Sequence, residues 1–185
     1  GHTLVATPGQ VMELDSWTNK VGSFGASQAW SAVFMADGGV LVAAPPEILF
    51  LKDTNADGRA DVREVLFKGF VLGVTDSNMN GLRWGLDNRV HGLNGGNGGT
   101  ITSTRQAGPP VPIPNLDFSF DPASGDFATT YQTSAGFGLV FDEWGRSFVT
   151  YNINHIQHRA ISARQLRRVP GFPPLEATTS ISDHE

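Results

Sequence analysis

The chain contains no cysteine. This absence excludes disulfides, thiolate metal sites, a cysteine nucleophile and a C-x-x-C-H haem attachment within the chain. Membrane-spanning runs are also missing, because the longest apolar stretch, VLVAAPPEILFL, is interrupted by Pro45 and Pro46 and falls short of the ~18 residues that a spanning helix needs. Positive charge is scarce, and a net charge of -5 argues against a nucleic-acid partner, since few phosphate counterions would be released.

The residues that are abundant favour a turn-rich β protein. Hydrophobic residues make up 39% and charged residues 17% of the 185 positions, with 22 glycines and 11 prolines. A packed core is therefore expected, of the size of one domain. The sequence begins at Gly1 and ends in SISDHE, and we interpret it as a piece of a longer protein.

The stretch DTNADGRADVRE, residues 53–64, has the ligand spacing of an EF-hand calcium loop. Five side chains offer oxygen and a backbone carbonyl is expected at the seventh position, Arg59; the five are Asp53, Asn55, Asp57, Asp61 and Glu64. Residues 47–52 and 62–69 on either side have strand patterns, so the helices of an EF-hand are not expected. The sequence predicts either a structural calcium clamp on a hairpin or a turn whose Asx side chains bind their own backbone.

Three segments of the chain repeat one pattern, in which an aromatic residue precedes a turn residue by four positions and a β-rich run follows. The aromatics are 50 and 57 residues apart, and the pairs are Phe34 with Gly38, Trp84 with Asn88, and Phe141 with Gly145. This spacing suits four-stranded propeller blades. We expect an all-β fold, a β-propeller arc of about three to four blades over residues 25–185, preceded by an N-terminal lead-in over residues 1–24.

The quoted motifs also resemble one family when read in order: GGVLVAAPPEILFLKDTNADGRADVREVLFKGF, NGLRWGLDNRVHGLNGGNGG, DFSFDPASGDF and FGLVFDEWGRSFVTYNINHIQH. They are similar to the N-terminal propeller of the membrane-bound dehydrogenases of planctomycete-type bacteria, over about residues 25–185. The resemblance implies an arc of a six-bladed type of ring, related to quinoprotein glucose and sorbosone dehydrogenases that use pyrroloquinoline quinone (PQQ) and calcium outside the cytoplasm. It also implies a c-type haem domain elsewhere in the full-length protein and a periplasmic or extracellular location. The quinoprotein signature G-x-R-N-x-Q-G is absent here.

Two polar stretches are candidate ligand sites. In HGLNGGNGG, His91 and Asn94 either face a ligand or belong to a long turn that needs positive φ. In YNINHIQH, Asn152 and Asn154 either line a channel or satisfy backbone groups. His155 is the candidate general base, because its unperturbed pKa near ~6.5 suits proton abstraction from an alcohol. Zinc on His155 and His158 is not expected, because residues i and i+3 of a strand face opposite ways.

Two functions of different classes follow. The first is an extracytoplasmic, quinoprotein-like sugar or alcohol dehydrogenase domain, in which Arg83, His91, Asn152 and His155 converge on one channel. The second is a calcium-stiffened propeller that binds a carbohydrate or a protein and catalyses nothing. Trp84 and Trp144 are expected to pack within the sheets rather than to serve as sugar platforms.

Overall fold

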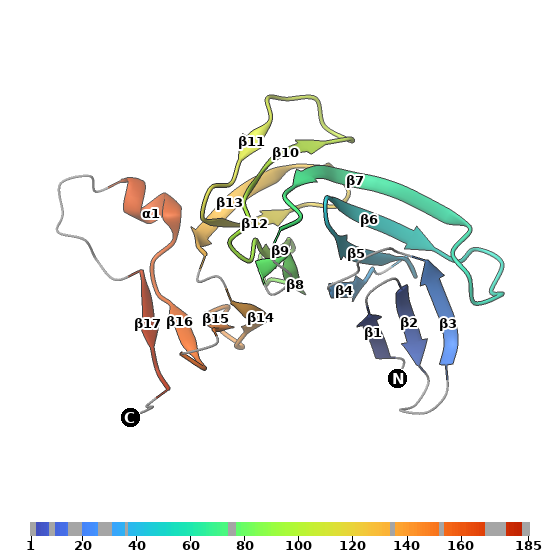
Figure 1. Cartoon of the computed structure of the whole chain (residues 1–185), viewed down its shortest axis with the longest axis horizontal. Coiled ribbons are helices and arrows are strands. Elements are labelled where there is room, and N and C mark those ends of the chain that lie inside the picture. The colour runs from blue at the N-terminus through green and yellow to red at the C-terminus, as the bar shows by residue number, and fades with distance from the viewer. Residues whose placement is uncertain are drawn as a thin grey trace.

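The computed structural model describes residues 3–7, 10–14, 20–25, 31–35, 37–73, 77–133, 136–151, 154–168 and 177–182. The described chain is all-β and antiparallel, with one short helix, α1 (Ala163–Arg167). None of its helices is long and apolar enough to cross a membrane. The all-β expectation is confirmed, and the sheets follow one another around an open arc that the described residues do not close into a ring (Figure 1).

The described strands form four sheets that follow one another in sequence. The first sheet contains β1 (Thr3–Thr7), β2 (Gln10–Leu14) and β3 (Lys20–Gly25). The second is built on β4 (Ser31–Phe34), β5 (Val40–Ala44), β6 (Glu47–Lys52) and β7 (Val62–Phe70). The third contains β8 (Asn80–Trp84), β9 (Val90–Leu93), β12 (Leu116–Phe120) and β13 (Phe127–Gln132). The fourth contains β14 (Phe137–Phe141), β15 (Ser147–Thr150), β16 (Gln157–Arg159) and β17 (Thr178–Ser180).

The second sheet gains two more strands from an insertion between β9 and β12. Strand β10 (Gly99–Ser103) pairs with β7, and β11 (Val111–Pro112) pairs with β10 at the outer edge. Proline is tolerated in β11 because an edge strand has one side free of ladder hydrogen bonds. The β10–β11 insertion, which lies between two strands of the third sheet, therefore joins the third sheet to the second through the pairing of β10 with β7.

The three sequence repeats form the same hairpin in three different sheets. Each aromatic residue ends the first strand of its sheet, and the residue after it donates its amide to a carbonyl four positions on: Met35 to Gly39, Gly85 to Arg89, and Asp142 to Arg146. The turn residues Gly38, Asn88 and Gly145 have φ values of 85°, 58° and 78°, which glycine and asparagine tolerate. The predicted repeat is confirmed.

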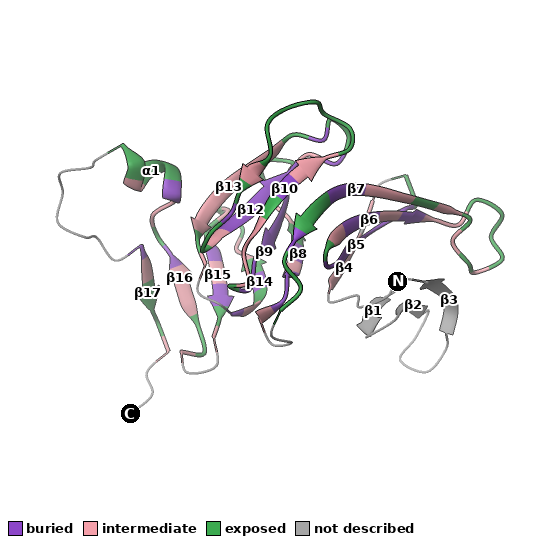
Figure 2. Cartoon of the chain, turned by 45° about the horizontal axis from the view of Figure 1, so that its top comes forward, coloured by how far each residue is buried: buried purple, intermediate pink, exposed green. Residues whose placement is uncertain are grey.

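The main core lies between the second and third sheets. Phe67, Phe118 and Phe120 are fully buried, and the rings of Phe67 and Phe120 lie 4.9 Å apart. A smaller cluster of Leu93, Leu139 and Val149 joins the third sheet to the fourth. Figure 2 shows buried residues along β9 and β12, while the β6–β7 loop and the β10–β11 loop are exposed. Neighbouring sheets are thus joined through packed faces, and their first strands β4, β8 and β14 lie next to one another.

Candidate functional site

A pocket of about 240 Å³ lies between the third and fourth sheets. The β8–β9 and β14–β15 turns, which are equivalent in the repeat, form two of its walls. Its lining contains backbone, aromatic and titratable groups: Gly85, Leu86, Asp87, His91, Tyr131, Phe141 and Gly145. The pocket is therefore created where two copies of the same turn approach each other.

His91 and Asp87 form the polar centre of this pocket. Nε2 of His91 lies 3.1 Å from both carboxylate oxygens of Asp87, while Nδ1 is buried and has no hydrogen-bond partner. The imidazole meets Phe141 edge-on, with ring centroids 5.0 Å apart. A Cβ on Gly85 would lie 2.8 Å from His91 Nε2 and 2.6 Å from Asp87 Oδ1. Glycine at position 85 therefore leaves the space that the pair occupies.

Burial is the main influence on the charge of His91, which is 8% exposed. It lowers the pKa of the imidazole, and the hydrogen bond and charge of Asp87 oppose this shift only in part. The positive charges of Arg159 and Arg89 lower the pKa further. The net shift is below the ordinary histidine value, so a neutral imidazole faces Asp87 at neutral pH.

A buried ion pair lies behind the pocket and joins its two sheets. Arg159 of β16 donates through Nη1 to Asp117 of β12 at 2.6 Å, and both side chains are almost completely buried. Nε and Nη2 of Arg159 both donate to Ser147 Oγ, at 2.9 and 2.7 Å. The guanidinium also lies 4.4 Å from the ring centroid of Tyr131. Arg159 thus supports the aromatic wall of the pocket from behind.

The ion pair is compensated on the carboxylate side as well. Asp117 accepts the backbone amide of Asn94 at 2.8 Å and the hydroxyl of Thr133. Burial raises the pKa of Asp117, while Arg159 and these two donors lower it. Burial likewise lowers the pKa of Arg159, and the charge of Asp117 raises it. The pair is accordingly satisfied, and it is costly to break from either side.

The structure brings together only part of the predicted ligand site. Arg83 and His91 are directly opposite each other in the β8–β9 ladder, and Arg83 Nε donates to Leu139 O at 3.2 Å. His155 and Asn154 lie in the β15–β16 turn, at the other end of the fourth sheet from the β14–β15 turn. His155 is in a turn, not in the strand continuation that its sequence suggested. Asn152 lies outside the described residues.

Asn94 is part of the framework of its glycine-rich loop. It is 1% exposed, and its side chain donates to Ile113 O at 2.9 Å and accepts the amide of Gly98 at 3.0 Å. Gly95 has a φ of 74°, as the long-turn interpretation of this loop predicts. The side chain of Asn94 is thus hydrogen-bonded within the loop.

The calcium-type loop connects β6 to β7, so the prediction of two flanking strands is confirmed. Asp53 accepts the amides of Asn55, Ala56 and Gly58 at 3.1, 2.7 and 2.7 Å. Slight desolvation raises the pKa of Asp53, but these amides outweigh it and lower the pKa. Asp61 accepts the hydroxyl of Thr54 at 2.7 Å.

Successive Asx turns continue through this loop. Asn55 Oδ1 accepts the amide of Asp57, and Asp57 Oδ1 accepts the amide of Arg59. Glu64, expected at the twelfth ligand position, instead makes a bidentate ion pair with Arg105 at 2.9 and 2.6 Å. Within the described part of the chain, no three acidic or histidine side chains converge as a metal cluster.

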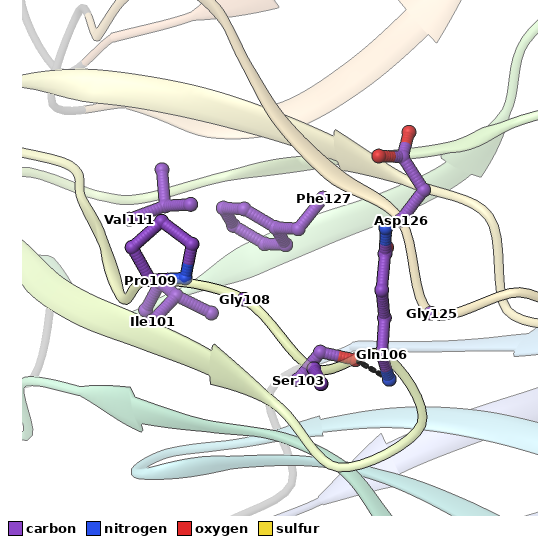
Figure 3. Close-up of a pocket in the computed structure, with 10 residues that line it drawn as sticks. Ile101, Ser103, Gln106, Gly108, Pro109, Val111, Gly125, Asp126 and Phe127 are labelled. Carbon is purple, nitrogen blue, oxygen red and sulfur yellow. Dashed lines mark hydrogen bonds between the residues drawn. The ribbon is translucent and has the colours of Figure 1, made fainter.

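A second pocket, of about 180 Å³, lies between the β10–β11 loop and the β12–β13 turn (Figure 3). Apolar side chains contribute much of its lining, among them Ile101, Val111 and Phe127. Its carboxylate, Asp126, is bound by Arg89 at 2.7 Å, and Ser103 Oγ accepts the amide of Gln106 at 3.1 Å. This pocket contains no second titratable group that could act with Asp126.

Sequence reasoning missed Asp87, Tyr131 and the Asp117–Arg159 pair. Asp87 had a local signal, because it precedes His91 by four positions across a tight turn. Asp117 and Arg159 are 42 residues apart and lie on different sheets, so no local pattern connects them. Trp144 was expected to pack within the sheets, but it is 70% exposed, because the tip of the β14–β15 turn carries it away from them.

The fold and the pocket define an all-β protein of repeated antiparallel sheets with a polar site between two of them. Residues 28–185 match the family described as Domain of unknown function (DUF7133), and the chain belongs to this family. A solved structure described as a protein of unknown function from Bacteroides caccae is similar, with a TM-score of 0.47 and 13% identity. That likeness covers 85% of this chain and 68% of the other. No protein with a curated description matches the chain.

Proposed function

We propose that the chain is an arc of a β-propeller and that the pocket between its third and fourth sheets binds a small hydroxylated molecule, a sugar or an alcohol. The observation that carries this proposal is the pairing of His91 with Asp87 beside the aromatic walls Tyr131 and Phe141. A cavity of about 240 Å³ is below the ~300–1,000 Å³ of sites for drug-sized ligands, which suits one small molecule.

The propeller is supported by positions that recur in every repeat. In each repeat, the residue just before the repeated aromatic pairs across the hairpin with the residue seven positions after that aromatic. These pairs lie on the face toward the next sheet, and they are Val33 with Leu41, Arg83 with His91, and Val140 with Phe148. The first pair is packed into the core and the second meets the fourth sheet. In the third pair Val140 is 51% exposed. A further sheet in a larger ring would cover this face as the third and fourth sheets cover the others.

The polar pair suits hydroxyl recognition. The carboxylate of Asp87 accepts hydrogen bonds from hydroxyl groups, and its side chain is 51% exposed at the pocket. The phenol of Tyr131 can donate or accept. Phe141 and Tyr131 offer apolar surface to the C–H groups of the same ligand. One carboxylate with aromatic walls thus matches a neutral polyol better than an anion.

Calcium binding by the β6–β7 loop is the second part of the proposal. The loop would supply the carboxylates of Asp53, Asp57 and Asp61, the amide oxygen of Asn55 and the carbonyl of Arg59, all oxygen ligands of the kind calcium prefers. Glu64 would join them only by leaving Arg105. The ion would hold the β6–β7 hairpin, at a distance from any chemistry in the pocket.

A quinoprotein-like dehydrogenase is the second candidate, favoured by the carboxylate of Asp87, which is 51% exposed and is held by Nε2 of His91 at 3.1 Å. A carboxylate at this position could accept a proton when an alcohol is oxidised. PQQ, a tricarboxylate, does not fit this pocket, whose lining contains the carboxylate of Asp87 and whose volume of about 240 Å³ suits one small molecule. A quinone that accepts the electrons would therefore bind elsewhere in the full-length protein, in the periplasm or outside the cell. The earlier candidate base, His155, lies at the other end of the fourth sheet and stays a prediction.

Ligand binding is tested by isothermal calorimetry with glucose, xylose and glycerol. The parent protein and His155→Gln are expected to bind one of these probes equally. Asp87→Asn is expected to weaken binding at least tenfold, and His91→Gln more strongly. Loss of binding in His155→Gln but not in Asp87→Asn would move the site to the β15–β16 turn, and no binding by the parent would refute the proposal. Visible absorbance with added PQQ and the sugar separates the dehydrogenase from the binding domain.

Calcium is tested by the same method with the double variant Asp53→Ala, Asp57→Ala. The parent is expected to release heat and gain thermal stability with calcium, and the double variant to do neither. Arg105→Ala frees Glu64, so it is expected to tighten calcium binding if Glu64 is a ligand. Equal calorimetric traces for the parent and the double variant would leave the loop as a hydrogen-bonded turn.

A further inference from the structure

We infer that the pocket takes an amino sugar or a small amino alcohol, whose ammonium group binds the carboxylate of Asp87. This inference rests on the proposed function, since it narrows the ligand class of the same pocket. Asp87 belongs to the pocket lining, and its side chain is 51% exposed. A ligand can therefore reach this carboxylate, and a hydrogen bond between two charged groups is stronger than one between neutral groups.

The carboxylate of Asp87 is oriented by neutral donors. The backbone amide of Arg89 donates to Oδ1 at 3.2 Å, and Nε2 of His91 lies 3.1 Å from both oxygens. Nδ1 of His91 is buried and has no hydrogen-bond partner among the described residues, so an imidazolium would leave a buried N–H unsatisfied there. The imidazole therefore donates from Nε2 in its neutral form and does not balance the charge of Asp87.

The two arginines whose charges act on this imidazole are bound by other carboxylates. Arg89 donates from Nη1 to Asp126 at 2.7 Å, and Arg159 donates from Nη1 to Asp117 at 2.6 Å. Among the ion pairs of the described residues, the imidazole is the only partner of Asp87. Three carboxylates and two guanidinium groups thus surround the pocket, in a chain with a net charge of -5, which favours a cationic ligand.

The equivalent turn of the second sheet shows such a carboxylate paired with an ammonium group. Asp37 has in the β4–β5 turn the position that Asp87 has in the β8–β9 turn, and its Oδ1 accepts the amide of Gly39, two positions later, at 3.1 Å. Nζ of Lys52 lies 3.6 Å from Oδ2 of Asp37. Within the described part of the chain, no lysine pairs with Asp87. The ammonium group of a ligand would supply the partner that Lys52 supplies to Asp37.

The aromatic lining also suits a cation. Tyr131 and Phe141 line the cavity, and the ring electrons of both residue types attract positive charge. Tyr131 already has the guanidinium of Arg159 at 4.4 Å from its ring centroid. A primary ammonium has three N–H donors, enough for a carboxylate oxygen and the phenol oxygen of Tyr131. The cavity of about 240 Å³ leaves room for the hydroxyl groups of one sugar unit.

Calorimetry with two matched pairs of ligands tests the inference: glucosamine against glucose, and serinol against glycerol. In each pair an ammonium group replaces one hydroxyl group. Near neutral pH and at low salt, the parent protein is expected to bind the amine of at least one pair about tenfold more tightly than its alcohol. The uncharged N-acetylglucosamine is expected to bind no more tightly than glucose, and added salt should reduce the preference for the amine.

Two variants locate the charge that recognises the amine. Asp87→Asn is expected to bind the amine and the alcohol equally, because the amide keeps an acceptor oxygen but carries no charge. Asp37→Asn is the matched control, since it removes the same carboxylate from the equivalent turn, outside the pocket lining. The control is expected to keep the preference of the parent, and thermal unfolding shows that both variants are folded.

The outcomes separate this inference from the proposed function. A parent protein that binds glucose or glycerol at least as tightly as the matching amine overturns the inference and leaves the proposed function unchallenged. A parent that binds none of the four ligands refutes the proposed function and the inference with it. A preference for the amine that persists in Asp87→Asn, or that is lost equally in Asp37→Asn, would show that the ammonium group does not bind Asp87, and the inference would be wrong.

Discussion

Removing the positive member of the buried Asp117–Arg159 pair is expected to cost more stability than any surface change. In Arg159→Met the carboxylate of Asp117 stays where its side-chain exposure is 0% and loses a charged partner at 2.6 Å. The side chain of methionine fills much of the same space, so the main effect is the uncompensated charge. Breaking a buried pair from one side costs about 3–5 kcal/mol.

The structure places the expected loss near the lower end of that range. Asp117 keeps two donors, the amide of Asn94 and the hydroxyl of Thr133, which continue to stabilise its charge. At ~2–4 °C per kcal/mol for a chain of this size, a loss of about 3 kcal/mol lowers Tm by roughly 6–12 °C. The double variant Asp117→Leu, Arg159→Met removes both charges, and replacing a buried pair by apolar residues of similar volume is often neutral. The amide of Asn94 and the hydroxyls of Thr133 and Ser147 lose their partners, at about 1–3 kcal/mol for each group that finds no other partner.

Urea and thermal unfolding at neutral pH measure these differences. The deficit of Arg159→Met relative to the parent is also expected to shrink in acid. In Arg159→Met the pKa of Asp117 in the folded state is expected to rise further above its value in the unfolded chain. The variant therefore loses stability relative to the parent as pH rises through that folded-state pKa. A single variant within about 1 kcal/mol of the parent, or a double variant less stable than the single, would contradict this account of the pair.

Three further outcomes are expected. Gly85→Ala should lower the free energy of unfolding by about 1–3 kcal/mol and weaken ligand binding in the pocket, because its Cβ would lie 2.8 Å from His91 Nε2. The control Gly108→Ala, whose Cβ would have no atom within 4 Å, should leave the free energy of unfolding in urea unchanged. Because the pKa of His91 is lower in the folded protein than its ordinary value of 6.5, the stability that neutral His91 contributes should be fully present above pH 6.5 and should decline as pH falls toward the folded-state pKa. His91→Gln should lack that decline in thermal scans. Arg105→Ala should cost only about 0.2–1 kcal/mol, since its pair with Glu64 is partly exposed, and less in high salt.

Each of these expectations has a contrary result. Equal stability of Gly85→Ala and Gly108→Ala would show that the turn adapts without disturbing His91. A parent and a His91→Gln variant with parallel stability between about pH 5 and pH 7 would assign the acid sensitivity to other groups. A salt-independent loss in Arg105→Ala would mean that packing of its alkyl chain, and not the ion pair, stabilises the β10–β11 loop.

The hairpins could be predicted because their signals are local. The aromatic residue, the turn residue four positions later and the following β-branched run lie within a dozen residues, and the backbone of Gly38 or Asn88 decides the turn by itself. The loop at residues 53–61 was correctly placed between strands for the same reason. Its Asx turns use side chains and amides separated by two to five positions.

The candidate site was only partly predictable. Arg83 and His91 were named from sequence, and the β8–β9 register brings them opposite each other. His155 and Asn154 have equally polar sequences, but strand direction takes them to the far end of the fourth sheet. Glu64 matched the twelfth position of a calcium loop, yet the pairing of β10 with β7 brings Arg105 within 2.6 Å of it.

The sequence by itself determined the β class, the repeat and the turns, because glycine, asparagine and Asx chemistry act over a few bonds. Only the tertiary structure decided which faces are covered, that Arg159 reaches Asp117 across two sheets, and that Trp144 stays in water while Trp84 packs against the core. Those outcomes depend on how one sheet stacks on the next. A repeat with the same local pattern can therefore bury an aromatic residue in one sheet and expose one in another.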